Sequence, residues 1–124
     1  MYACGEESIT QPETYYSLLR DLKWSHTEKS IARKAFDRAL KQELDSTLQE
    51  ARARLARMKQ PTQLWDLEHF LTERRKYIDR LYDFRYSVLP VVFGNLIRLR
   101  RLTEDDLRAL REDKLAAIRR QATR

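Results

Sequence analysis

The chain has 124 residues, of which 35% are charged and 42% hydrophobic, and a formal net charge of +6. This length suits one domain or one protomer of a small oligomer, and the scarcity of breakers, two glycines and three prolines, favours long helices over a sheet. We expect a cytoplasmic protein, because the sequence shows no signal-peptide pattern, no apolar run of about 18 residues and a single Cys4 that cannot form an internal disulfide.

Residues 1–23 are expected to form an amino-terminal arm, and residues 24–124 a single domain. The segment GEESITQPE is polar and contains Pro12, which is typical of a loose chain. The next segment, TYYSLLRDL, fits one or two helical turns. The arm is therefore either a mobile tail or a segment that docks on the body through its apolar side chains, Tyr15, Tyr16, Leu18 and Leu19.

A long helix is predicted to begin after Ser25, because Ser25 and Glu28 have the spacing of a capping box. No proline or glycine follows until Pro61. From residue 44 the apolar positions step by four, three, four and three, which is a heptad seam. Its members are Leu44, Leu48, Ala51, Leu55 and Met58. Such a rod cannot fold on its own core, so it needs an antiparallel neighbour or a second copy, and we predict a homodimer.

A second helix is predicted over residues 63–87, after a turn at Pro61. One side of this helix carries an apolar stripe, formed by Leu64, Leu67, Leu71, Ile78 and Leu81. We place Leu64, Leu67 and Leu71, with the seam leucines and Ala51, in the dimer interface. Arg74 and Arg85 interrupt the stripe, and Asp79 and Asp83 are nearby candidates to pair with them.

The other side of this helix is a candidate partner-binding surface, because it combines a tryptophan with charged residues. Its members are Trp65, Glu68, His69, Thr72 and Arg75. Tryptophan and arginine are residue types that anchor protein interfaces. The alternative is that Trp65 packs on the first helix or across the dimer seam and has only a structural role.

Residues 88–124 are predicted to form a compact helical head. Pro90 restarts the helix, and the segment around it is apolar nearly all round, which indicates burial on several sides. A last helix should begin at the cap Thr103. Its apolar positions, Leu107, Leu110, Leu115 and Ile118, would close over the head. Aromatic side chains should pack the junction of stalk and head: Tyr77, Tyr82, Phe84 and Tyr86.

The sequence contains no catalytic constellation, so we predict a protein that is not an enzyme and needs no cofactor or metal. His26 and His69 are far apart, one cysteine cannot complete a zinc site, and two glycines cannot build a phosphate-binding loop. Nucleic-acid binding is an alternative, motivated by the net charge and by the arginines at 52, 54 and 57 and at 98, 100 and 101. Interleaved acids and the absence of a reader motif argue against it.

The stretches WDLEHFL and ERRKYIDRLYDFRYSVLPVVFGNL resemble the fluorescence recovery protein family of cyanobacteria. The resemblance extends back through AFDRALKQELDSTL and forward through EDDLRALREDKLAAI, and so covers residues 24–118. It implies an all-α homodimer in which two long helices form an antiparallel hairpin, with a small carboxy-terminal helical head. It also implies binding to the photoactivated red form of the orange carotenoid protein, chiefly to its C-terminal domain. The expected effect is a faster return to the orange resting form and an end to quenching at the phycobilisome.

The family's functional patch is a tryptophan, a His-Asp pair and an arginine. By resemblance, Trp65 and Arg75 match its two ends. The His-Asp pair falls on Glu68 and His69, so an acid and an imidazole are both present but displaced by one residue. The alternative is a dimeric relative that keeps the scaffold for another partner.

Overall fold

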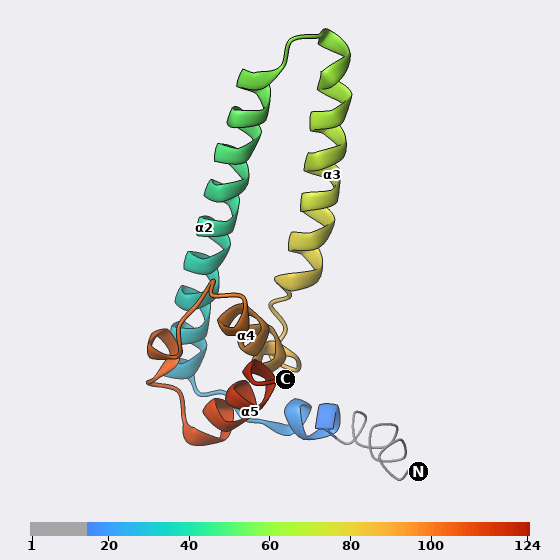
Figure 1. Ribbon diagram of the computed structural model, residues 1–124. Helices are drawn as coiled ribbons and strands as arrows, with labels where there is room; N and C mark the ends of the chain where they lie inside the picture. Colours follow the sequence, from blue (N-terminus) through green and yellow to red (C-terminus); the bar gives the residue numbers. More distant parts are fainter. Residues whose placement is uncertain (1–14) are drawn as a thin grey trace, which may run out of the picture.

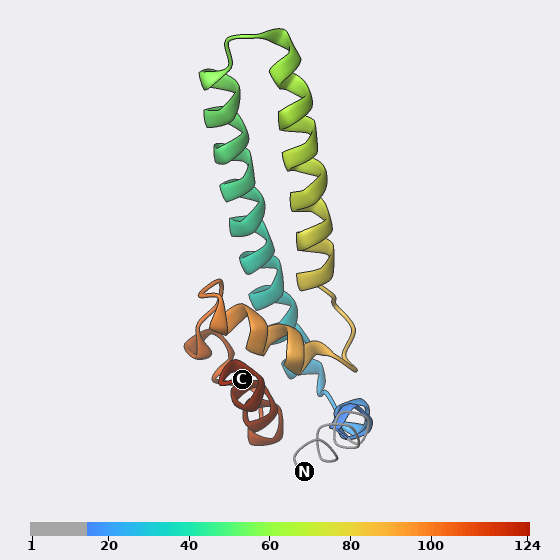
Figure 2. The same ribbon diagram turned by 45° about the vertical axis from the view of Figure 1, so that its right-hand side comes forward.

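The computed structural model describes residues 15–124, and within that range it consists of helices and connecting loops, which confirms the all-α prediction. The elements are α2 (His26–Arg57), η1 (Pro61–Gln63), α3 (Leu64–Leu81), α4 (Leu89–Arg98), η2 (Glu104–Leu107) and α5 (Glu112–Ala122). Residues 15–21 form a further short helix ahead of α2. Helices α2 and α3 lie side by side as a hairpin that rises from a head built on α4 and α5 (Figures 1 and 2). None of the helices in residues 15–124 is long and apolar enough to cross a membrane.

The ends of α2 follow the local sequence signals. Ser25 Oγ accepts a hydrogen bond from the Glu28 N–H at 3.1 Å, and Glu28 Oε1 accepts one from the Ser25 N–H at 3.0 Å. The predicted capping box is therefore confirmed. The helix ends at Arg57, and Pro61 opens the short turn that leads into α3.

Helix α3 ends at Leu81, so the prediction of one helix over residues 63–87 is wrong at its carboxy-terminal end. Tyr82 leaves the helix with φ −109° and ψ 86°. Its hydroxyl donates to the backbone carbonyl of Ala39, 3.2 Å away, and its ring packs edge-on against Phe36 on α2. These contacts fix the Tyr82 side chain on α2 at the point where α3 ends, while the Tyr82 N–H still donates to the Ile78 carbonyl at 2.9 Å.

The core of the head includes the first half of α2, so this helix belongs to both the stalk and the head. Buried side chains from α2, α4, η2, α5 and the loops that flank η2 form one cluster: Ala32, Ala35, Phe36, Ala39, Leu89, Val92, Phe93, Leu96, Leu102, Leu107, Leu110, Leu115 and Ile118. Gly94 lets α4 and α5 approach closely, since a Cβ there would lie 2.4 Å from Gln121 Cβ. The predicted apolar head and its four covering leucine and isoleucine positions are confirmed.

The last predicted helix is two elements. Thr103 caps η2, as expected, but Arg111 is extended, with φ −69° and ψ 160°, and α5 starts at Glu112. The interruption has a tertiary cause, because the Arg111 N–H donates to Glu28 Oε2 on α2 at 2.9 Å. Glu28 thus binds two segments that are distant in sequence.

The described part of the arm docks on the head. Leu19 is buried, and the carbonyl of Lys23 accepts a hydrogen bond from Lys114 Nζ. The docking alternative is confirmed for Leu19, whereas Leu18 is 61% exposed. Residues 1–14, and with them Cys4, lie outside the described residues.

Candidate partner-binding surfaces of the hairpin

One side of the hairpin presents an apolar surface to solvent. Its exposed side chains are Leu44, Leu48 and Leu55 on α2 and Leu64 and Leu71 on α3, all between 40% and 52% exposed. Ala51 and Leu67, the other two residues predicted at the dimer interface, are half-buried. An apolar surface of this kind is unusual on a lone protomer. We call these seven positions the leucine face.

Trp65, in the first turn of α3, is 69% exposed, so it does not pack on α2 of its own protomer. Exposure of a large indole is costly in water and favours a partner. Glu68 and Thr72 follow Trp65 at three and seven residues, which places them on the same stripe of the helix. Glu68 is exposed and Thr72 is half-buried.

The remaining two predicted site residues turn to opposite sides of the hairpin. His69 lines a groove on one side, together with Asp66 and Glu73. Arg75 lines a groove on the other side, next to Leu71 and Leu44 of the leucine face. The structure therefore groups Trp65, Glu68 and Thr72 on an outer ridge and places His69 and Arg75 on its two flanks.

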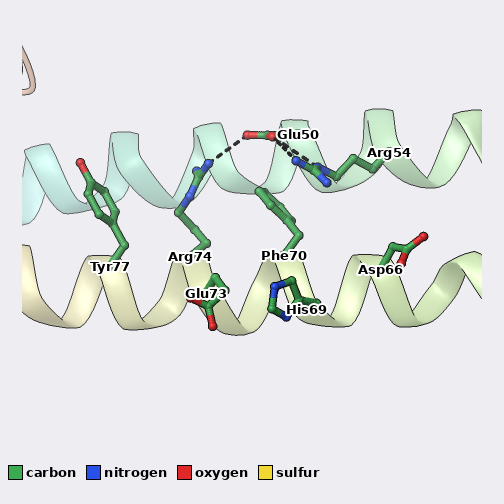
Figure 3. Close-up of a pocket in the computed structure, with 8 residues that line it drawn as sticks. All are labelled: Glu50, Arg54, Asp66, His69, Phe70, Glu73, Arg74 and Tyr77. Carbon is green, nitrogen blue, oxygen red and sulfur yellow. Dashed lines mark hydrogen bonds and ion pairs between the residues drawn. The ribbon is translucent and has the colours of Figure 1, made fainter.

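The His69 groove lies between α2 and α3 and is shown in Figure 3. Its lining residues are Glu50, Arg54, Asp66, His69, Phe70, Glu73, Arg74 and Tyr77. The Phe70 ring lies between two guanidinium groups, 4.0 Å from that of Arg54 and 5.0 Å from that of Arg74. Glu50 joins both arginines, at 3.0 Å and 3.1 Å. Arg74 thus pairs across the hairpin, and not with Asp79 as the sequence suggested.

Electrostatics in this groove are set by Glu50. Hydrogen bonding from Arg54, helped by Arg74, holds the pKa of the Glu50 carboxyl below its usual value against an opposing effect of desolvation. Within residues 15–124 no group of three or more histidine, cysteine, aspartate or glutamate side chains is placed to hold a metal ion.

The Arg75 groove is more apolar. Leu40 and Leu44 on α2 and Leu71 and Ile78 on α3 line a cavity of about 430 Å³, whose polar members include Arg75 and Asp79. Since Arg75 borders the leucine face, a second chain on that face would lie beside this guanidinium. Arg75 is exposed in the protomer.

A buried glutamate joins the base of the hairpin to the head, and the sequence pattern gave no sign of it. Glu43 is 4% exposed and accepts hydrogen bonds from the Tyr82 hydroxyl and from Arg101 Nε, both at 2.9 Å. Burial, together with this glutamate, raises the pKa of Tyr82. Asp83 and Arg85 form a local ion pair, as predicted, with Arg85 Nε 2.9 Å from Asp83 Oδ1.

These pairings also bear on nucleic-acid binding. Arg54 pairs with Glu50, and Arg101 with Glu43, so each of the two arginine clusters is partly neutralised inside the fold. The positive charge left for a phosphate backbone is smaller than the sequence count implies.

Comparison with known proteins places the fold and the hairpin in one group of regulators. The family described as photoprotection regulator fluorescence recovery protein matches residues 24–122. The fluorescence recovery protein of Synechocystis sp. (strain ATCC 27184 / PCC 6803 / Kazusa) is 34% identical over 96 residues, which are 77% of this chain and 88% of that protein.

Solved structures of fluorescence recovery proteins have a similar fold. The Fremyella diplosiphon fluorescence recovery protein superposes with a TM-score of 0.77 at 34% identity, over 82% of this chain and 100% of that chain. The Synechocystis sp. PCC 6803 protein gives a TM-score of 0.77 at 33% identity, with the same coverage.

Proposed function

Because this chain belongs to the photoprotection regulator fluorescence recovery protein family, we propose that it binds the red, photoactivated form of an orange carotenoid protein. It accelerates return to the orange resting form, and so ends quenching at the phycobilisome. The contact is chiefly with the C-terminal domain of the carotenoid protein and takes place in the cytoplasm. The observation that carries this proposal is the exposed Trp65, on a helix that matches the family along its whole length.

The active form is a homodimer joined through the leucine face. Five leucines that are 40% to 52% exposed, on two antiparallel helices, provide an elongated apolar area. A stable interface buries about 1,200–2,000 Å² in total, and the long hairpin offers an elongated surface for it. Trp65 lies beside this face and not in its centre, so it is available to a partner at the edge of the dimer.

The protein acts by selective binding and not as an enzyme with its own reactive groups or cofactor. A protein that speeds reversion must stabilise the transition state between the red and orange forms more than it stabilises the red form. A hairpin joined across its two helices by the Glu50–Arg74 pair, and tied to the head by the Glu43–Arg101 pair, suits this task. The dimer would hold the two linked domains of the carotenoid protein near each other. A high effective concentration would then replace the free diffusion of those domains.

The test is recovery of the orange form after a light pulse, followed by absorbance with and without this protein. Trp65→Ala and Arg75→Ala should each abolish the acceleration while far-ultraviolet circular dichroism and the dimer remain unchanged. Arg80→Ala is the matched control, because Arg80 is an exposed arginine on the same helix but outside the five-residue surface. Loss of helicity or of the dimer in the Trp65 variant would make that residue part of the scaffold.

At Glu68 and His69 this chain departs from the family's functional patch, which has a His-Asp pair there. If the wild-type chain neither binds nor accelerates any carotenoid protein, the scaffold serves another partner. In that event the fold and the exposed Trp65 are unaffected, the dimer keeps its own test, and only the identity of the partner changes.

A further inference from the structure

The arm lies outside the part of this chain that matches the compared proteins. The family match begins at residue 24. The Fremyella diplosiphon structure is covered along 100% of its length while covering 82% of this chain. The helix over residues 15–21 therefore lies outside the matched region, and it packs against the head through Leu19.

The arm helix is held at both of its ends. At one end, the Tyr15 hydroxyl lies 3.5 Å from the Ala117 carbonyl, and the Arg120 guanidinium lies 4.9 Å from the Tyr15 ring. At the other end, the Lys23 carbonyl accepts from Lys114 Nζ, which is itself buried. Leu19 fills the contact between them and is 2% exposed. The arm helix is therefore fixed on the head, and the surface beside it is formed before any ligand binds.

It borders a groove on the head, which we call the arm groove. Its lining residues are Tyr16 and Arg20 from the arm and Arg85, Ser87, Val88 and Val91 from the start of α4 and the segment before it. The cavity measures about 600 Å³, within the usual range of about 300–1,000 Å³ for binding clefts. Two valines and a tyrosine ring supply apolar surface, and two guanidinium groups supply the charge.

The charge of the arm groove is positive and incompletely balanced. Among residues 15–124, none of those that line it is acidic. Arg20 donates to Ser17 Oγ at 3.0 Å and forms no ion pair with any residue between 15 and 124, while Arg85 shares its charge with Asp83. The adjoining first turn of α4 carries no acidic side chain, so the helix dipole adds to the positive potential.

We propose that the arm groove binds a short acidic segment of a partner protein. An apolar side chain of that segment contacts Val88 and Val91, and its carboxylates pair with Arg20 and Arg85. This site is on the head and is distinct from the Trp65 surface of the hairpin. It goes beyond the proposed function and does not depend on it.

The test uses a fluorescein-labelled peptide, EELLEE, and its matched forms QQLLQQ and KKLLKK, added to the full-length protein and followed by fluorescence anisotropy at low salt. EELLEE should bind saturably and at least about tenfold more tightly than either matched peptide. Arg20→Gln should weaken EELLEE binding about tenfold, and Val91→Asp should abolish it, because it places a carboxylate among the ligand's own. Circular dichroism checks that both variants keep their helices.

Arg57→Gln is the matched control, since it removes one exposed arginine at the far end of α2 and should leave EELLEE binding unchanged. Equal binding of the three peptides, no saturable binding, or equal weakening by Arg57→Gln and Arg20→Gln would overturn the proposal. So would displacement of EELLEE by the chain's own segment GEESITQPE at lower concentration than unlabelled EELLEE requires, because the groove would then serve an intramolecular ligand.

Discussion

Lys114 on α5 and Glu28 in the first turn of α2 form an ion pair with Nζ and Oε1 3.1 Å apart, and their side chains are 1% and 3% exposed. Glu28 also accepts hydrogen bonds from the N–H groups of Ser25 and Arg111. The Glu28 carboxylate therefore caps α2, binds the backbone N–H of Arg111 just before α5 begins, and neutralises the buried Lys114. Burial of two charges is tolerable only because their hydrogen bonds are nearly complete.

Removal of the lysine alone should be strongly destabilising. Lys114→Ala leaves the Glu28 charge buried without its partner, and we expect a loss of about 3–5 kcal/mol in the free energy of unfolding. Urea titration followed by circular dichroism measures it. Arg108→Ala, which breaks a pair that is 79% exposed on both sides, should cost less than about 1 kcal/mol. Equal losses in the two variants would contradict a buried pair.

The same carboxylate predicts an acid limb in stability. Burial alone would raise the pKa of Glu28, but hydrogen bonds from the Ser25 and Arg111 backbone and from Lys114 outweigh it and lower the pKa from 4.5 to about 2. Because the folded pKa lies below the unfolded one, the stabilisation is fully present above pH 4.5 and is lost as the pH falls toward 2. The amount is on the order of 3 kcal/mol.

Thermal unfolding between pH 7 and pH 2 measures this effect. Glu28→Gln should be less stable than wild type at pH 7, and the difference between the two proteins should shrink as the pH falls below 4.5. A difference that stays constant across this range would show that the Glu28 carboxyl does not titrate as the structure implies.

Arg100 offers a gain in stability. It follows α4 with φ 63°, the left-handed conformation that glycine adopts without strain. The Arg101 N–H donates to the Leu96 carbonyl at 2.8 Å, as a Schellman cap requires. Arg100→Gly should therefore raise the free energy of unfolding by about 0.5–1 kcal/mol. Arg98→Gly, inside the last turn of α4, should lower the free energy of unfolding by about 0.5–1 kcal/mol. A change of the same sign in both variants would contradict the prediction.

A charge on the leucine face tests the dimer. Leu48→Glu puts a carboxylate where the proposed partner chain packs, and we expect dissociation at micromolar concentration or loss of the fold. Light scattering and sedimentation give the mass. Gln49→Glu adds the same charge at an exposed position of α2 that is turned about 100° away from Leu48, and it should leave the mass unchanged. A wild-type monomer at micromolar concentration would reject the dimer itself.

Local sequence signals determined where most helices start. The Ser25–Glu28 capping box, the Pro61 turn and the Thr103 cap each depend on residues at most three or four positions apart, so the sequence predicts them without knowledge of the fold. Helical periodicity likewise predicted that Trp65 lies away from the apolar stripe, which its 69% exposure confirms. The dimer and the partner at this surface stay predictions.

Tertiary structure alone decided where α3 ends and which charges meet. Tyr82 leaves the helix for contacts to Ala39 and Glu43, which precede it by about forty residues. Arg74 pairs with Glu50 on the facing helix and not with Asp79, which is nearer in sequence, because the register of the hairpin places Glu50 3.1 Å from the Arg74 guanidinium. That same register turned His69 and Arg75 to opposite flanks of the hairpin. Periodicity gives the angle of a side chain around its own helix, but the groove that it lines depends on where the neighbouring helix packs.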